Sequence, residues 1–297
     1  MAKIHIQFTL FSAFYTPLIV TMAGGFLRDE GLDHDWSVAP PGKSAVEAIV
    51  NGSAQVIQSA PSQGFNSLLK GEEPIAVHFA QINEMDGFFI TAREPDPGFT
   101  WNKLEGASVV MFKGGQPNAM FRYACHRAGI DFDRLVPLTP GGAADIDAAF
   151  RDGQGEYVQQ QGPFPQQIES DGVGNIVARV GPQIGPCAFS SLAASREWLA
   201  SDEAVAFTRA YSRARNHLVQ TPAAEIVGLV GSWFADTDTY ALLRCIESYQ
   251  AHGCWTPHVA ITPKAYEVIL DVFQYVDHIC ERYPYEKVCV APPGGIA

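Results

Sequence analysis

Polar, aromatic and glycine residues occur together in five short segments that each follow a predicted strand. These segments are residues 12–15, 59–62, 84–87, 114–116 and 160–164. They offer aromatic faces, hydroxyls, amides and free backbone donors, which suit an organic ligand with a flat or apolar body and a polar or anionic group. They suit a metal ion poorly, because a metal site needs several converging His, Cys or carboxylate side chains.

The ligand-binding residues are predicted to lie in these segments. In open parallel sheets, ligands bind beyond the carboxyl ends of the strands and at helix N-termini. No segment contains an arginine, although Lys113 is adjacent to one, so the charge of the ligand stays open. The predicted ligand-binding residues are Ser12, Phe14, Tyr15, Ser59, Pro61, Ser62, Asp86, Gly114, Gly115, Gln116, Gln161 and Phe164.

Several of these residues also have a purely structural interpretation. The pair Gly114-Gly115 either receives an anionic group at the start of the next helix or forms only a tight turn. Asp86 either pairs with a hydrogen-bond donor of the ligand or belongs to an Asp-Gly turn. Phe14, Tyr15 and Phe164 lie in turns rather than in periodic runs, which favours stacking of their rings on a ligand.

Cysteine and histidine residues form no recognisable catalytic or metal site. Cys187 could act as a nucleophile, but no base is identifiable near it, so a buried, unreactive thiol is the favoured interpretation. His252 and His258 flank Cys254, yet three ligands at irregular spacing are more typical of surface or core residues. We therefore predict no catalytic residue, no metal and no cofactor.

The composition argues against a nucleic-acid-binding or membrane-spanning protein. The formal net charge is −12, and the chain has no basic stripe of the kind that phosphate contacts require. No apolar stretch reaches the roughly 18 residues needed to span a bilayer. Hydrophobic residues make up 47% of the 297 residues and charged residues 18%, which indicates a large buried core.

The start of the chain and its cysteines bear on the compartment. The alternating apolar residues of 4–10 predict a strand, and nothing at the start of the given sequence resembles a secretory leader. As the sequence stands we expect a cytoplasmic protein, whereas a leader ahead of Met1 would make it periplasmic. The six cysteines contain no CxxC pair, and free buried thiols are the favoured interpretation in a chain of this size.

The elements that position the five segments alternate between strands and helices. A β-α-β-α-β order over residues 4–58 predicts a mainly parallel sheet flanked by helices, and a second such series covers 107–151. The Pro/Gly-rich stretch 94–98 predicts the first boundary between two lobes, and residues 185–190 predict the return. We therefore predict an α/β fold with a first lobe of 1–93 plus 190–297, a second of 94–189, and a ligand cleft between them.

Five stretches in a fixed order resemble a known family. They are residues 17–32, 45–52, 59–62, 104–106 and 189–198. In these stretches the chain resembles the nitrate, sulfonate, taurine and thiamine-precursor group of ABC-transporter substrate-binding proteins. The resemblance implies a periplasmic-binding-protein-like type II fold that closes about a hinge. It also implies a solute-binding protein for a sulfonate, aromatic acid or pyrimidine-like ligand, with an ABC permease as partner in uptake.

Enzymes and sensors on the same fold provide the alternative function, acting on a small aromatic or heterocyclic substrate. The eukaryotic pyrimidine synthase of thiamine biosynthesis resembles this group but has a cysteine-rich run where residues 185–190 retain only Cys187. Sulfinate desulfinases of similar fold have a nucleophilic cysteine after the first strand, where this chain has Ser12-Ala13-Phe14. Both departures favour binding without turnover.

Overall fold

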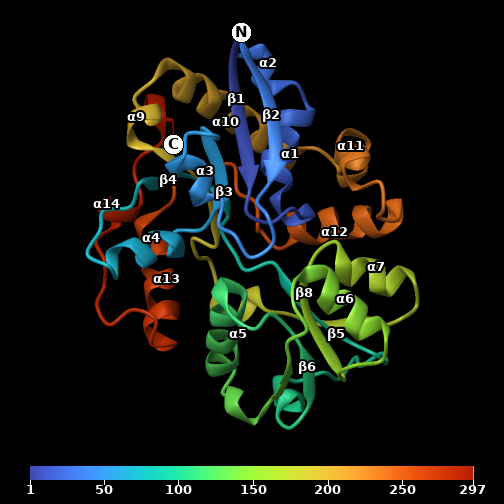
Figure 1. Cartoon of the computed structure of the whole chain (residues 1–297). Helices are drawn as coiled ribbons and strands as arrows, with labels where there is room; N and C mark the ends of the chain where they lie inside the picture. Colours follow the sequence, from blue (N-terminus) through green and yellow to red (C-terminus); the bar gives the residue numbers. More distant parts are fainter. Residues whose placement is uncertain (297) are drawn as a thin grey trace.

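The computed structural model describes residues 1–296 and has two lobes, each built on a five-stranded sheet with helices on its faces (Figure 1). In both sheets four strands run in one direction and one runs against them. The predicted two-lobed α/β fold with mainly parallel sheets is therefore confirmed.

The first sheet has the strand order β2-β1-β3-β10-β4, and β10 is the antiparallel strand. Its strands are β1 (Ala2–Phe8), β2 (Leu32–Val38), β3 (Val56–Ser59), β4 (Ala76–Asn83) and β10 (Ser190–Ser195). Side chains alternate between its faces: Val56 and Leu192 join the main core, while Ile57 and Ala193 pack into a separate cluster with Ile49. Because both faces are covered at the centre of the sheet, β3 is buried throughout and β10 in five of its six residues.

The second sheet has the order β7-β6-β8-β5-β9, and β5 is the antiparallel strand. Its strands are β5 (Phe88–Ala92), β6 (Ser108–Val110), β7 (Val136–Leu138), β8 (Tyr157–Gln161) and β9 (Asn175–Arg179). Val110 and Val158 pack against Phe150 on one face, and Val109 faces the main core on the other.

Helices cover both sheets, and none within residues 1–296 is long and apolar enough to cross a membrane. The second lobe carries α5 (Gly115–Arg127), α6 (Ala143–Arg151), α7 (Phe164–Ser170), α8 (Gly181–Ile184), η2 (Trp101–Leu104) and η3 (Phe132–Arg134). The other helices are η1 (Ala13–Tyr15), α1 (Thr16–Ala23), α2 (Phe26–Asp29), α3 (Val46–Val50), α4 (Ser62–Leu68), α9 (Arg196–Leu199), α10 (Asp202–Gln220), α11 (Ala223–Val230), η4 (Gly231–Phe234), α12 (Thr239–Ala251), α13 (Pro263–Tyr275), α14 (Tyr285–Val288) and η5 (Pro293–Gly295).

The long C-terminal helices begin at the side-chain caps that their sequences provide. Ser201, Asp238 and Thr262 accept hydrogen bonds from backbone N–H groups in the first turns of α10, α12 and α13. Helix α12 packs against α7 of the second lobe, and the Asp238 N–H donates to Gln167 Oε1 at 2.7 Å. The C-terminal segment thus contacts both lobes.

The chain passes between the sheets twice, and the first passage differs from the sequence prediction. It lies between β4 and β5, at residues 84–87, rather than at 94–98. The strand Phe88–Ala92 is buried, as is β4 before it in the chain, but its hydrogen-bonding partners are β8 and β9 of the second sheet. The second passage lies between β9 and β10. By sheet membership we propose lobe boundaries at 84–87 and 185–189.

A buried arginine anchors the end of β4 just before the first passage. Arg215 of α10 is 1% exposed and donates to the carbonyls of Gln81 and Ile82 at 2.7 and 3.0 Å. Its other terminal nitrogen donates to the Thr256 carbonyl at 2.6 Å. The guanidinium therefore fixes the strand from which the crossing starts to the helical layer of the first lobe.

Candidate functional site

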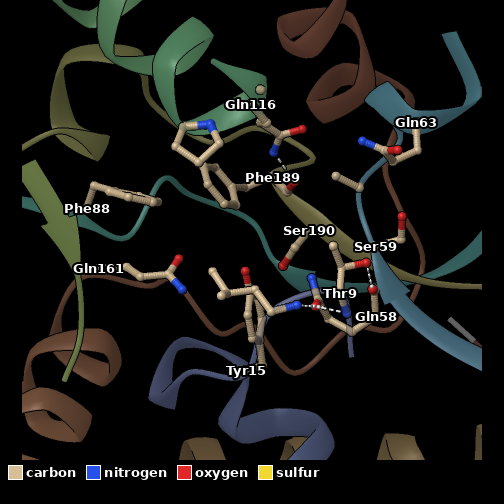
Figure 2. A pocket seen from close by; sticks show the side chains of 14 residues that line it. Thr9, Tyr15, Gln58, Ser59, Gln63, Phe88, Gln116, Gln161, Phe189 and Ser190 are labelled. Atoms are coloured by element: carbon tan, nitrogen blue, oxygen red, sulfur yellow. Dashed lines mark hydrogen bonds between the residues drawn. The ribbon is translucent and has the colours of Figure 1, made fainter. Parts of the chain in front are cut away.

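A cavity of about 220 Å³, here named the inner cavity, lies between the two sheets. Its walls come from the carboxyl ends of β1, β3 and β8, the N-terminus of α5, and both passages between the lobes. This is the place where open α/β sheets bind ligands. Its lining residues, drawn in Figure 2, are Thr9, Leu10, Tyr15, Gln58, Ser59, Ala60, Gln63, Phe88, Gly115, Gln116, Pro117, Gln161, Phe189 and Ser190.

Aromatic rings form the apolar part of the inner cavity. Phe88 follows the first passage and Phe189 ends the second, and their ring centroids are 6.1 Å apart. Tyr15 approaches from a different side, next to Gln161 (Figure 2). Burial raises the pKa of the Tyr15 phenol far above its ordinary value, so its hydroxyl stays neutral. The rings offer flat apolar surface together with one neutral hydroxyl.

Amides and hydroxyls form the polar part. Gln58 Oε1 accepts hydrogen bonds from the N–H groups of Thr9 and Leu10 at 3.1 and 3.2 Å, and so fixes the turn after β1. Ser59 ends β3, is 2% exposed, and its Oγ has no hydrogen-bond partner within residues 1–296. A buried hydroxyl without a partner is costly, and a ligand in the cavity can satisfy it.

None of the lining residues of the inner cavity is charged. Lys113, the cation nearest to the glycine pair in sequence, is exposed and does not line it. A charged ligand would lose its hydration here and meet no side chain of opposite charge, and the N-terminus of α5 is the one feature of the lining that favours an anion. The electrostatics of the cavity thus favour an uncharged ligand with hydrogen-bonding groups along its edge.

Direct hydrogen bonds hold the two lobes together around the cavity. Gln116 of α5 accepts from Ser62 Oγ at 2.7 Å and donates to the carbonyl of Phe189. Ser12 Oγ donates to the Gly162 carbonyl at 2.6 Å. The Tyr249 hydroxyl of α12 accepts from the Gly162 N–H at 2.7 Å and donates to the Gly87 carbonyl at 3.0 Å. The structure therefore has closed lobes.

The structure brings part of the predicted residue set into the inner cavity. Tyr15, Ser59, Gly115, Gln116 and Gln161 line it. The other predicted residues lie outside the lining: Ser12, Phe14, Pro61, Ser62, Asp86, Gly114 and Phe164.

Phe14 shows why a turn position does not guarantee exposure to a ligand. Its ring is fully buried, 4.9 Å from the Tyr249 ring and 5.3 Å from the Phe189 ring by centroids. A Cβ atom at Gly87 would clash with the Phe14 ring, so the glycine at this position makes room for the ring. Phe14 thus packs against the first passage instead of facing the cavity, because the short helix η1 turns its side chain inward.

The remaining predicted residues outside the lining have structural positions of their own. Ser12 caps η1 and links the lobes through Gly162. Pro61 is buried before α4, and Gly114 is exposed before α5. Phe164 is the half-buried first residue of α7. Ser62 reaches the cavity only through its hydrogen bond to Gln116.

Asp86 lies in the first passage and is 3% exposed. Its Oδ1 accepts from the Phe88 N–H at 2.7 Å, which is the turn geometry foreseen as the structural interpretation. Its Oδ2 has no partner within residues 1–296, and burial raises the pKa of this carboxyl to about 7. Asp86 thus holds the passage in place two residues before Phe88 of the cavity wall.

Sequence reasoning missed several lining residues: Thr9, Leu10, Gln58, Ala60, Gln63, Phe88, Pro117, Phe189 and Ser190. One signal was available for Gln58, because an amide at the end of an otherwise apolar strand has to find polar partners. Phe88 and Phe189 could be found only by locating the passages, and the first was placed too late in the chain.

The thiols and histidines do not form a reactive centre. Cys187 is fully buried, and burial raises the pKa of its thiol well above the ordinary value, as it does for Cys245 and Cys254. His258 contacts Glu84 at 3.2 Å, while His252 bonds within α12. No three His, Cys, Asp or Glu side chains of residues 1–296 come together as a potential metal site.

Solved structures of binding proteins share this fold. The ligand-binding component of an ABC-type import system from Staphylococcus aureus superposes with a TM-score of 0.77 at 14% identity, covering 98% of this chain and 97% of that one. The alkanesulfonate-binding protein SsuA from Xanthomonas axonopodis pv. citri, bound to MOPS, superposes with a TM-score of 0.71 at 18% identity, over 99% and 98% of the two chains.

Sequence comparison gives the family. A curated protein of Bacillus subtilis (strain 168), named "Putative binding protein YtlA", is 28% identical over 293 residues, which are 97% of this chain and 87% of that protein. The model of the NMT1-like family matches residues 4–228, a stretch that includes β1, β3, β5, β8 and β10, from which most of the inner cavity is built. The chain belongs to the NMT1-like family.

Proposed function

We propose that this protein is the solute-binding component of an ABC-type uptake system and captures a small, uncharged, pyrimidine-like heteroaromatic compound in the inner cavity. One observation carries the proposal. The lining combines three aromatic rings with side-chain amides and hydroxyls and includes no charged side chain. A flat ring can stack on aromatic faces while neutral donors and acceptors bind its edge.

The names of similar proteins support the transport part of the proposal. They include a binding protein, an alkanesulfonate-binding protein and the periplasmic nitrate-binding protein NrtA from Synechocystis PCC 6803. The proposal therefore includes an ABC permease as partner and a periplasmic location. It departs from the sulfonate and nitrate relatives in the ligand, because a permanent anion would lie in the inner cavity without a cation beside it.

The alternative is an enzyme or sensor that acts on a similar compound. The lining of the inner cavity includes no Cys, His, Lys, Asp or Glu, so it lacks the usual general bases and the most reactive nucleophiles. Its hydroxyls, those of Thr9, Tyr15, Ser59 and Ser190, have no base within the lining to activate them. This chemistry favours binding over turnover.

The test is a ligand panel measured by titration calorimetry and native mass spectrometry. The panel contains uncharged pyrimidines, aromatic carboxylates and sulfonates, and freshly purified protein is first examined for a retained compound. We expect the uncharged pyrimidines to bind most tightly and to be recovered unchanged. Tighter binding of the sulfonates would overturn the ligand class, and conversion of a bound compound would overturn the binding function.

A further inference from the structure

A second cavity of about 300 Å³ adjoins the inner one and is here named the outer cavity. The two share Gln63, Gly115 and Gln116 as wall residues. The outer cavity differs in chemistry, because it contains charged and titratable side chains. Its polar lining includes Asn66, Asn118, Arg122, Asp277 and His278.

Arg122 is the main reason to assign a ligand to the outer cavity. Within residues 1–296 its guanidinium takes part in no ion pair and no hydrogen bond, and its Nε atom is buried without a partner. Its contact is with the face of the Phe132 ring, 5.2 Å from the centroid. Partly desolvated guanidinium groups are stabilised by anions, above all by oxyanions that accept two parallel hydrogen bonds.

Two further features of the outer cavity favour an oxyanion. Helix α5, which spans 13 residues, begins at Gly115 in the wall, and no side chain caps its N-terminus. Free N–H groups and the helix dipole attract negative charge at such a terminus. His278 lies in the wall formed by the first lobe, where its Nε2 donates to Asn66 Oδ1 at 3.1 Å, and in its imidazolium form the Nδ1–H can donate to an oxyanion.

Asp277 adds a negative charge to the lining of the outer cavity, opposite in sign to that of Arg122. Its carboxylate belongs to the same lining but forms no ion pair with Arg122 or His278 within the described residues 1–296. Since it repels an anion, it limits affinity and allows a direct test. Asp277 has a φ of 56°, a left-handed conformation that asparagine also tolerates, so its charge can be removed without straining the backbone.

The outer cavity spans the two lobes. Arg122 and Asn118 belong to α5 of the second lobe, whereas Asn66 and His278 belong to the first. Beside them the rings of His126 and Tyr275 stack across the lobe boundary with centroids 4.4 Å apart. A group bound between Arg122 and His278 therefore contacts both lobes and stabilises their closed arrangement.

We propose that the outer cavity is a binding site for one small oxyanion, a phosphate, sulfate or carboxylate group held by Arg122, the N-terminus of α5 and His278. The oxyanion is either free or the anionic end of a ligand whose ring occupies the inner cavity. The second arrangement rests on the ring site of the proposed function but replaces its uncharged ligand with an anionic one, whereas a free oxyanion is compatible with an uncharged ligand. In both arrangements the side chain of Gln116 lies between the two cavities and is held there by its hydrogen bond to Ser62.

The test uses inorganic phosphate and sulfate as probes in titration calorimetry, with chloride at equal ionic strength as the control. We expect one phosphate per chain. Arg122→Gln should weaken binding about tenfold or more, as loss of a charge-assisted contact predicts. Asp277→Asn should tighten it, and Arg127→Gln, on the exposed side of α5, should leave it unchanged. Thermal unfolding of each variant shows whether the fold is intact.

The following results would refute either the oxyanion site or the proposed function. Absence of phosphate binding by the folded wild-type protein, or equal affinity of the Arg122→Gln and Arg127→Gln variants, would refute the oxyanion site. Phosphate binding that depends on Arg122, together with no binding of any uncharged ring compound, would support this site and refute the proposed function.

A competition arm separates the two sources of the oxyanion. A ring compound with an acidic substituent is titrated into protein saturated with phosphate, beside the same ring without the substituent. Displacement of phosphate by the acidic compound alone assigns the site to the ligand's own anionic end. Simultaneous binding of phosphate and the uncharged ring assigns it to a free anion, and by linkage each should then strengthen the other.

Discussion

Replacement of Asp86 by asparagine should stabilise the protein above neutral pH and leave it nearly unchanged in acid. Burial raises the pKa of this carboxyl from 3.8 to about 7. The folded chain therefore keeps a proton that the unfolded chain releases, so the free energy of unfolding falls as pH rises from 3.8 towards 7. At about 1.4 kcal/mol per pKa unit, ionised Asp86 costs on the order of 4 kcal/mol.

Asparagine removes this cost because it cannot ionise. Its amide oxygen can still accept from the Phe88 N–H, as Asp86 Oδ1 does at 2.7 Å. Urea unfolding at a series of pH values measures the effect as the difference between variant and wild type, so that the other carboxylates cancel. The matched control is Asp152→Asn, since Asp152 is exposed and forms no ion pair within residues 1–296.

The expected difference grows from near zero at about pH 4 to its full value above pH 7. A difference in unfolding free energy that is the same at every pH would show that folding does not raise the pKa of Asp86. An Asp86→Asn variant less stable than wild type at alkaline pH would show that its Oδ2 has a favourable partner that the geometry does not reveal.

Three further substitutions test the Arg215 anchor at the end of β4 and the inner cavity. Arg215→Met should lower the free energy of unfolding, measured by chemical denaturation, by about 3 kcal/mol or more, because buried carbonyls lose their donors. The control is Arg209→Met, which breaks only an exposed ion pair with Glu30 and should lower the free energy of unfolding by less than about 1 kcal/mol. Ser59→Ala should weaken binding of the preferred panel compound about three- to tenfold in calorimetry while leaving the unliganded protein at least as stable as wild type, since the hydroxyl that is removed has no partner. Unchanged affinity would contradict contact of Ser59 with the ligand. Tyr15→Leu should weaken the same binding by removing ring and hydroxyl together, and equal affinity would show that the ligand lies elsewhere.

The alternation of strands and helices could be predicted because it is a local property. Apolar residues two positions apart mark β1, and residues at helical spacing mark α10 and α13, whose ends also carry side-chain caps. The sheet that a strand joins is not local. Phe88–Ala92 is a buried run like any inner strand, and only its pairing with β8 and β9 assigns it to the second lobe.

The candidate site was predictable at the level of segments rather than side chains. The turns after β1 and β3, the last residue of β8 and the start of α5 do border the inner cavity, as strand order requires. Which side chain of a turn faces the cavity depends on one or two backbone dihedral angles. In η1 they direct Tyr15 to the cavity and Phe14 to the core, although both are aromatic neighbours in sequence.

The two passages explain why hinge and cavity cannot be treated separately. A two-lobed chain must cross between its lobes beside the cleft, so some residues next to each crossing line the inner cavity. Phe88 and Phe189 are such residues, and both stand next to groups that fix the crossing. The carboxylate of Asp86 holds the N–H of Phe88, and Gln116 holds the carbonyl of Phe189. A rotation of one lobe against the other about these passages would displace both rings, and the ligand proposed for the inner cavity, packed between these rings and Tyr15, would resist it.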